Sequence, residues 1–269
     1  MKREEDRLLE GARAIAAKAG AAVMRHYHRP RSLRTKSDQS PLTAADLAAN
    51  KVSLDGLKRL GGPSRVITEE AGIPRYERRK SWYDFWLVDP LDGTKEFIKM
   101  NGEFTVNIAL IRRGRPALGV VYAPALKRMY FALKGRGAFR QTGAGLIRRI
   151  RYRKRRAGEA FRLVLSRSHR SEKEQLFLKT LGRSRPISAG SSLKFCLLAE
   201  GRAHLYPRFG PTHEWDVAAG DCVATEAGAP VWPRLKYNKD VLLNGSFLVG
   251  QVPALVKKDF QKIVRRKTL

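Results

Sequence analysis

Sulfur and negative charge are both scarce in this sequence of 269 residues. Two cysteines are present, Cys196 and Cys222, and because they form no C-x-x-C pair we expect two buried free thiols in a reducing compartment. No apolar run reaches the roughly 18 residues of a membrane span, and the first residues mix acids with bases and lack the apolar block of a leader peptide. We therefore expect a soluble cytoplasmic protein.

Acidic residues are outnumbered by basic ones, since 25 Asp and Glu stand against 54 Lys and Arg, which gives a formal net charge of +29. Such an imbalance attracts anions, and phosphorylated metabolites, nucleic acid and anionic lipid are the candidates. It carries no information about the fold. The few places where acids gather in this chain therefore need a cause.

Hydrophobic periodicity predicts a helix over 3–28 and a second helix that has Thr43 as its N-cap and stops at a Gly-Gly pair. The apolar run at 85–88 predicts a buried strand that is ended by Pro90. Three further apolar segments separated by turn residues predict an antiparallel meander, which the glycine-rich "GRGAF" closes as a hairpin and not as a phosphate loop.

The best candidate for a boundary lies at 141–160, where apolar residues are few and "RRIRYRKRR" occurs. We predict an N-terminal α+β half over 1–140, carrying most metal ligands, and a C-terminal α/β half over 141–269. No internal repeat is visible. In the second half, strands are expected at 162–166, 203–207 and 241–250, and helices at 171–181, 192–201 and 216–228.

Acids do gather in "DPLDGTKEF", residues 89–97, directly after the predicted buried strand. The proline and glycine turn the chain at once, so Asp89 and Asp92 can point into one small volume that the carbonyl of Leu91 also faces. Two bare carboxylates this close repel unless a cation compensates them. Carboxylate and carbonyl oxygens are hard donors that suit Mg²⁺. An ordinary surface turn explains the stretch about equally well.

Other acids occur at the ends of predicted elements. Glu69 follows a short strand, Asp216 opens a helix, and Asp46 lies three residues after Thr43. Each has an ordinary explanation: a loop acid, an N-cap, a capping box. Together they require several coincidences in an acid-poor chain. A cluster of Glu69, Asp89, Asp92 and Asp216 could hold two or more Mg²⁺ ions, which stabilise both the attacking and the leaving oxygen of a phosphoryl transfer.

These motifs resemble the inositol monophosphatase superfamily of Mg²⁺-dependent, lithium-sensitive phosphatases. "DPLDGTKEF" pairs with "EWDVAAG" more than a hundred residues later, and similar blocks extend from "SPLTAADLAA" over nearly the whole chain. "GSSLKFCLLAEG" and "YPRFGPTHEWD" look most like the 3'(2'),5'-bisphosphate nucleotidase branch of the bacterial CysQ type. The resemblance implies an α/β fold, a layered α/β/α/β/α sandwich with the site in a cleft between the halves.

The resemblance also implies roles for the matching residues. Asp46 and Thr94 match the catalytic pair that orients and deprotonates a water. The amides of Gly93 and Thr94 would hold the scissile phosphate at a helix start. The matching metal ligands, for two or three Mg²⁺, are Glu69, Asp89, the Leu91 carbonyl, Asp92 and Asp216. Substrate contacts are expected from Glu69, Leu91, Asp92, Gly93, Thr94 and Asp216.

A substrate with a second phosphate needs positive charge outside the metal site. Ser191 and Lys194 in "GSSLK" and Arg208 in "YPRFG" are the candidates. The inositol-specific branch carries a glutamate at the position of Arg208, whereas an arginine fork suits a phosphate. Ser166 and His169 are weaker candidates that fit an exposed loop at least as well.

The sequence thus predicts a phosphatase that removes the 3'-phosphate of adenosine 3',5'-bisphosphate and leaves AMP, with phosphoadenosine phosphosulfate as a second candidate substrate. The alternatives are an inositol monophosphatase-like sugar phosphatase and a basic nucleic-acid or membrane-surface binding protein on a phosphatase fold. The run "RRIRYRKRR" favours plain solvated surface. Peripheral contact with an anionic membrane on the cytoplasmic side stays open, and nucleic-acid contact is the minor alternative because few aromatics interleave the bases. His213 is assigned no role.

Overall fold

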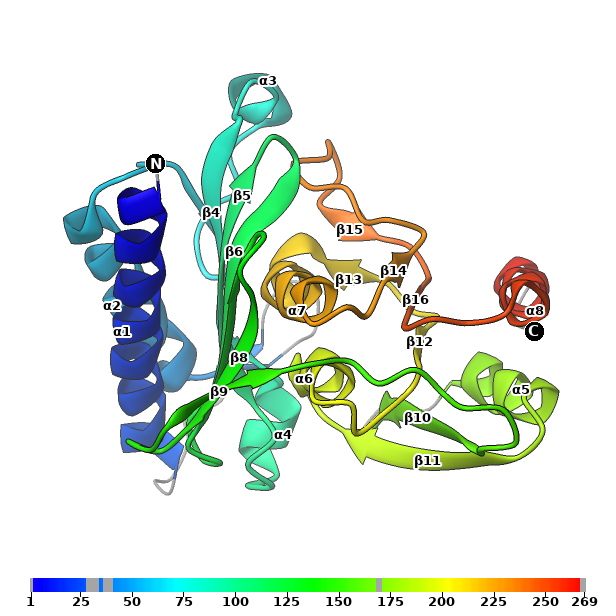
Figure 1. Cartoon of the computed structure of the whole chain (residues 1–269). Helices are drawn as coiled ribbons and strands as arrows, with labels where there is room; N and C mark the ends of the chain where they lie inside the picture. Colours follow the sequence, from blue (N-terminus) through cyan, green and yellow to red (C-terminus); the bar gives the residue numbers. More distant parts are fainter. Residues whose placement is uncertain (1, 28–33, 36–40, 168–170, 267–269) are drawn as a thin grey trace.

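The computed structural model describes residues 2–27, 34–35, 41–167 and 171–266, and its elements stack in five layers (Figure 1). Two long helices, α1 (Lys2–Tyr27) and α2 (Ala44–Leu60), form the first layer and pack on one face of a large sheet. As predicted, α2 begins after Thr43, and Gly61 caps its C-terminal end. Two short strands, β1 (Arg34–Thr35) and β2 (Pro41–Leu42), pair before it.

The second layer is a sheet of seven strands in the order β3-β4-β5-β6-β7-β8-β9. Only β3 and β4 run parallel, and the rest form the predicted antiparallel meander with its β7–β8 hairpin. The strands are β3 (Val66–Thr68), β4 (Asp84–Asp92), β5 (Thr105–Arg112), β6 (Arg115–Ala123), β7 (Arg128–Leu133), β8 (Gly137–Thr142) and β9 (Ile147–Ile150). Short helices α3 (Tyr76–Arg79) and α4 (Thr94–Ile98) flank β4 in the sequence.

The central strand β4 is apolar without interruption because both of its faces are covered. Phe85 and Leu87 join the core on the side of α7, whereas Trp86 and Val88 join the core under α1 and α2. The prediction that Pro90 ends this strand is wrong. A register shift between Asp89 and Asp92 accommodates the proline, and pairing with β5 resumes at Asp92.

The remaining layers come from the second half of the chain. Helices α6 (Leu193–Ala199) and α7 (Glu214–Glu226) cover the other face of the sheet, small sheets follow, and α5 (Glu172–Thr180) and α8 (Ala254–Arg265) lie outermost (Figure 1). The strands are β10 (Phe161–Ser166), β11 (Ser184–Ala189), β12 (Tyr206–Arg208), β13 (Thr212–His213), β14 (Val231–Trp232), β15 (Leu243–Asn244) and β16 (Phe247–Val249). The layered α/β/α/β/α fold is confirmed, although β11 and α8 were not predicted.

Three further observations bear on the sequence predictions. Both cysteines are buried and free, as expected. Strand β9 extends the large sheet past residue 140, and the division of the chain at that point stays a prediction. Among the described residues, no helix is long and apolar enough to cross a membrane.

Candidate active site

Acids from both halves of the chain meet at the carboxyl end of β4. Asp89 lies in the strand, Asp92 follows the register shift, and Asp216 is the third residue of α7. Burial, and after it the negative charges of Glu69, Asp92 and Asp216, raise the pKa of Asp89 well above its usual range. Burial also raises the pKa of Asp216, and Asp92 and Glu69 add to that effect. The four predicted acids therefore lie within each other's electric field.

The three aspartates share a hydrogen-bonding pattern. Asp89 Oδ1 accepts the amide two residues further on at 3.1 Å. Asp92 Oδ2 accepts the amide of Ser192 at 2.7 Å, and Asp216 Oδ2 accepts the amide of His213 at 2.8 Å. Within the described part of the chain, the second oxygen of each carboxylate has no hydrogen-bond partner. Each aspartate is thus held by the protein through one oxygen and presents the other.

The chemistry of this donor set fits a hard cation. Free oxygens from three mutually repelling carboxylates, of which Asp89 is almost fully buried, are the ligands that Mg²⁺ and Ca²⁺ take. The carbonyl of Leu91 lies in the same turn and accepts a 3.4 Å hydrogen bond from Thr94 Oγ1. In the side-chain positions of the described residues, no group of three or more His, Cys, Asp or Glu is arranged to hold a metal ion. Because like charges repel, we expect a cation to be needed to draw the oxygens together.

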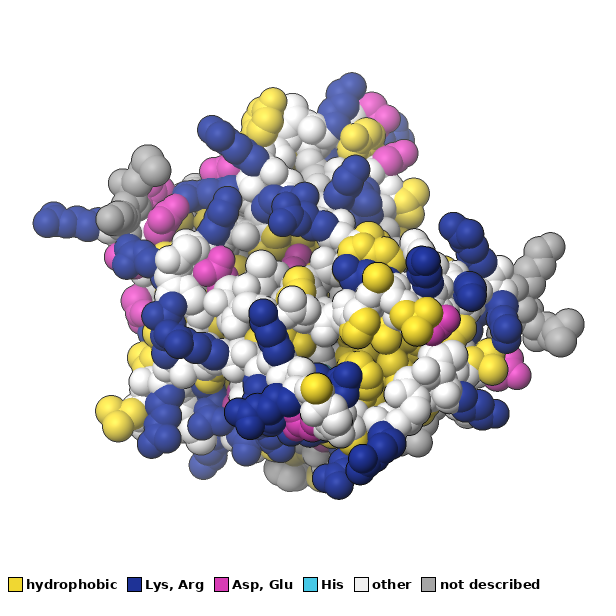
Figure 2. Space-filling model, turned by 45° about the vertical axis from the view of Figure 1, so that its right-hand side comes forward, with side chains coloured by type: hydrophobic (Ala, Val, Ile, Leu, Met, Phe, Trp, Pro, Cys, Tyr) yellow, Lys and Arg dark blue, Asp and Glu magenta, His cyan; other side chains and the backbone are white. Residues whose placement is uncertain are grey.

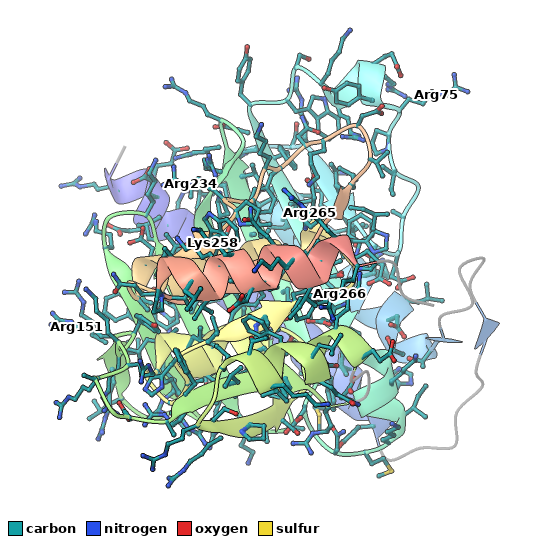
Figure 3. The ribbon with its side chains drawn as sticks, turned by 90° about the vertical axis from the view of Figure 1, so that its right-hand side faces the viewer. Arg75, Arg151, Arg234, Lys258, Arg265 and Arg266 are labelled. Carbon is teal, nitrogen blue, oxygen red and sulfur yellow. The ribbon has the colours of Figure 1, made fainter. Side chains whose placement is uncertain are left out.

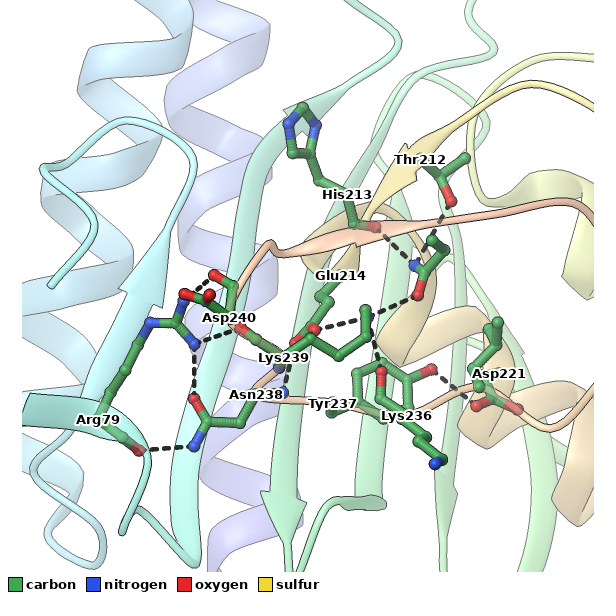
Figure 4. A network of polar contacts seen from close by, with 12 residues as sticks. Arg79, Thr212, His213, Glu214, Asp221, Lys236, Tyr237, Asn238, Lys239 and Asp240 are labelled. Carbon is green, nitrogen blue, oxygen red and sulfur yellow. Dashed lines mark hydrogen bonds and ion pairs between the residues drawn. The ribbon is translucent and has the colours of Figure 1, made fainter. Parts of the chain in front are cut away.

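The start of α7 is fixed by a buried polar network (Figure 4). Glu214 is fully buried and accepts the amides of Asn238 and Lys239 at 2.6 and 3.0 Å and the Lys239 ammonium at 2.6 Å. Arg79 donates to the carbonyls of Lys239 and Asp240, both at 2.6 Å. The strap at 238–240 is therefore clamped between α3 and α7, and Asp216 lies only two residues beyond the clamp.

Two cations lie beside the acids. Lys194 of α6 is 7% exposed, and its Nζ donates to the carbonyl of Ser191 at 2.7 Å. The pKa of Lys194 is lowered to about 8, mainly by burial; the charge of Asp92 opposes this shift and the charge of Arg208 adds to it. Arg208 of β12 donates to the carbonyls of Gly210 and Pro211 at 3.2 and 2.9 Å. The predicted cations are thus neighbours, and the charge of Arg208 makes the Lys194 ammonium more costly to keep charged.

Ser191 completes this group. Its backbone has a φ of +44°, in the left-handed region that serine rarely adopts. Its hydroxyl is buried and has no hydrogen-bond partner among the described residues. A Cβ added to Gly93 would lie 3.3 Å from Cβ of Ser191, so the two halves touch here. A strained turn that carries a buried, unpaired hydroxyl and whose carbonyl accepts from Lys194 is typical of a ligand site.

The chain is similar to known proteins over most of its length. The model of the inositol monophosphatase family matches residues 4–266. The chain belongs to that family. The 3'(2'),5'-bisphosphate nucleotidase CysQ of Salmonella typhimurium is 51% identical over 226 residues, which cover 83% of this chain and 89% of the relative. The enzyme of the same name from Buchnera aphidicola is 41% identical, over 87% of this chain and 88% of the relative.

Solved structures of the family have the same fold. The crystal structure of CysQ from Bacteroides thetaiotaomicron aligns with a TM-score of 0.79 at 40% identity, and the match covers 90% of this chain and 96% of that one. The inositol monophosphatase of Thermotoga maritima aligns with a TM-score of 0.76 at 24% identity, over 93% and 94% of the two chains.

The predicted catalytic pair occupies two different helix starts. Asp46 is almost fully buried in the first turn of α2, where its Oδ2 accepts the amide and the hydroxyl of Thr43 at 2.8 and 2.6 Å. The capping box that offered the ordinary explanation is therefore present. Thr94 opens α4 after Gly93, whose φ is +89°. The pairing of Asp46 with Thr94 on a water stays a prediction, as does phosphate binding by the amides of this single-turn helix.

Sequence reasoning missed the residues that hold Asp92. Asn107 and Thr105 of β5 donate to Asp92 Oδ2 at 3.2 and 3.4 Å, and the amide of Ser192 donates to the same oxygen. The signal was available, since two polar residues at alternate positions interrupt the apolar strand "TVNIALI". The contact of Ser192 had no such signal, because it joins residues 100 positions apart.

The weaker candidates are placed as follows. Ser166 ends β10. Burial raises the pKa of the Glu174 carboxyl of α5, and a backbone hydrogen bond from Ser166 is one of the contacts that oppose this rise. His169 lies outside the described residues. The ring of His213 stacks on Trp215, with 4.5 Å between centroids and 6° between planes.

Proposed function

We propose that the protein is a 3'(2'),5'-bisphosphate nucleotidase that releases the 3'-phosphate of adenosine 3',5'-bisphosphate and leaves AMP. The observation that carries the proposal is the pair of neighbouring cations beside the acidic cluster, the buried Lys194 and the partly exposed Arg208. One substrate phosphate would lie at the acids with a cation, and the second at these two side chains. Relatives named for this activity are 41–51% identical over most of the chain.

We propose Mg²⁺, as two or three ions, for the acidic cluster. The ligands would be Glu69, Asp89, the Leu91 carbonyl, Asp92 and Asp216. When bound, the cations supply Lewis-acid polarisation of the phosphate and a lowered pKa for the attacking water. The hydrogen bonds to one oxygen of each aspartate support this assignment, because they orient the other oxygen without consuming it.

In the proposed reaction, Asp46 accepts the proton of the attacking water and Thr94 orients that water through its hydroxyl. The amides of Gly93 and Thr94 donate to the scissile phosphate. The phosphate that is not cleaved accepts from Ser191 Oγ and from the Lys194 and Arg208 side chains. The binding energy of this second phosphate holds the nucleotide in place while the 3'-phosphate reacts.

A substrate panel tests the proposal. We expect kcat/KM for adenosine 3',5'-bisphosphate to exceed that for inositol 1-phosphate and fructose 1,6-bisphosphate. Because hydrogen bonds to charged groups contribute about 1.5–3 kcal/mol, Arg208→Ala should lower kcat/KM for the bisphosphate by about tenfold to a hundredfold. It should leave inositol 1-phosphate, which has no second phosphate, nearly unaffected. Preference for inositol 1-phosphate would overturn the assignment. Phosphoadenosine phosphosulfate belongs in the same panel.

The excess positive charge, in this proposal, attracts the anionic substrate. Lysines and arginines are scattered over the face in Figure 2, and in Figure 3 Lys258 lies on α8 while Arg75, Arg151 and Arg234 lie on other segments around that helix. Part of the basic run is paired locally, since Arg153 lies 3.0 Å from Glu159, which also pairs with Arg162 beyond the run at 3.1 Å. We propose a cytoplasmic enzyme, and sedimentation with anionic vesicles would test the additional hypothesis of peripheral membrane contact.

A further inference from the structure

Ser192 connects the two halves of the site through both its backbone and its side chain. Its amide donates to Asp92 Oδ2, and its hydroxyl donates to the carbonyl oxygen of Asp216 at 2.7 Å. The same hydroxyl accepts a hydrogen bond from Asn107 Nδ2 at 3.0 Å, and Asn107 Nδ2 also donates to Asp92 Oδ2. Ser192 and Asn107 are both 1% exposed, so water does not compete for these bonds. One buried network therefore joins β4, β5, α6 and α7.

The turn that carries Ser192 is fixed from its other side. The amide of Gly190 donates to Glu103 Oε2 at 2.8 Å, and Arg167 holds the same carboxylate with two bonds of 2.6 and 2.7 Å. A Cβ added to Gly190 would lie 2.6 Å from the carbonyl oxygen of Glu103, so only glycine fits here. The position of Ser192 relative to the acids is thus determined by the surrounding backbone.

We propose that Ser192, with Asn107, is a positioning residue that sets the spacing between the free oxygens of Asp92 and Asp216 and thereby the affinity of the site for its cations. Both aspartates reach the network through atoms that a cation would not use: Oδ2 of Asp92 and the carbonyl of Asp216. The free carboxylate oxygens of Asp92 and Asp216 then lie at one fixed distance from each other when they bind a cation, instead of over a range of distances. This inference rests on the proposed role of Asp92 and Asp216 as cation ligands.

The expected size of the effect follows from what one buried partner contributes. Residues that orient a metal ligand typically change metal affinity about tenfold to a hundredfold when they are replaced. Ser192→Ala keeps the amide and removes only the hydroxyl, so we expect the lower end, a Mg²⁺ affinity about tenfold weaker. At saturating Mg²⁺ the KM for adenosine 3',5'-bisphosphate should stay unchanged, because the substrate contacts are intact.

Isothermal titration calorimetry with Mg²⁺ and no substrate is the primary measurement, and thermal unfolding with and without Mg²⁺ accompanies it. Ser53→Ala is the matched control. Ser53 is equally buried, and its hydroxyl also donates to a carbonyl, that of Ala49 in α2 at 2.8 Å. This control should lose some stability and keep its Mg²⁺ affinity. Asn107→Ala and the double variant complete a cycle, and we expect the two losses to be less than additive because both act on one network.

Three outcomes separate the hypotheses. An affinity within about twofold of wild type in Ser192→Ala would overturn the positioning role. If Ser192→Ala does not fold, Asn107→Ala decides in the same way, since it removes the side-chain amide that donates to both Asp92 and Ser192. Asp92→Asn tests the proposed function separately: undiminished Mg²⁺ binding in that variant would remove Asp92 from the ligands, whatever Ser192 does.

Discussion

Replacement of Glu214 by alanine should lower the stability of the protein more than replacement of most surface charges. The change deletes a fully buried carboxylate and leaves two amides, of Asn238 and Lys239, and the Lys239 ammonium without their acceptor. Removing one partner of a buried ion pair costs about 3–5 kcal/mol. The Lys239 side chain is 29% exposed and can turn to water, so the lower end, about 3 kcal/mol, applies.

A loss of about 3 kcal/mol corresponds to a fall in Tm of about 6–12 °C for a chain of this size. Circular dichroism or scanning fluorimetry without Mg²⁺ would measure it. Lys51→Ala is the control, because Lys51 forms an exposed ion pair with Asp55 and should change Tm by less than about 2 °C. Glu214→Gln should fall between the two, since it keeps an acceptor and loses the charge. A Tm for Glu214→Ala within about 2 °C of wild type would refute the clamp at the start of α7.

Three further predictions concern the site and its charge. Asp89→Asn should abolish turnover and raise Tm in the absence of Mg²⁺, because burial and three neighbouring acids make the Asp89 charge costly; activity within about tenfold of wild type would refute its ligand role. The pKa of Lys194 lies at about 8, and the ammonium is present below that pH. The value of kcat/KM for the bisphosphate should therefore fall as pH rises through about 8, and Lys194→Arg should remove this fall. The same dependence of kcat/KM on pH in both proteins would contradict a role of Lys194 in binding. Because salt screens the attraction between charges over about 10 Å at 0.1 M, kcat/KM should decrease with ionic strength while kcat changes little. Neutralising the basic run 148–156 tests whether that run contributes to the attraction of the substrate.

The fold could be predicted where local pattern and burial agree. The run at 85–88 was correctly predicted as a buried strand because all its residues are apolar. They are apolar because alternate residues, such as Phe85 and Trp86, face two different cores. The end of that strand was misplaced because a register shift, which depends on pairing with β5, accommodates Pro90. Helix α8 was missed although Val256, Phe260 and Ile263 recur at helical spacing, because charged and polar residues separate these apolar positions.

The site residues could likewise be predicted in part. The acids stand out in a basic chain, and the family motifs placed them. The roles of Ser192 and Glu214 could not be predicted, because both depend on hydrogen bonds to residues that are distant in sequence. Ser192 donates to Asp92, and Glu214 accepts from Lys239. Strand β11 was also missed, since its residues are mostly polar or partly exposed and its parallel partner β10 determines its conformation.

The clamp formed by Arg79 has a consequence for folding. The meander from β5 to β9 joins neighbours in sequence and can form early, whereas Arg79 meets Asp240 161 residues later, and Asp92 meets Ser192 100 residues later. Contacts of such long range form slowly, because the chain must close a large loop before they contribute. The acids of the first half are therefore expected to assemble before Asp216 arrives. Refolding should then show recovery of β-sheet ellipticity ahead of recovery of enzymatic activity.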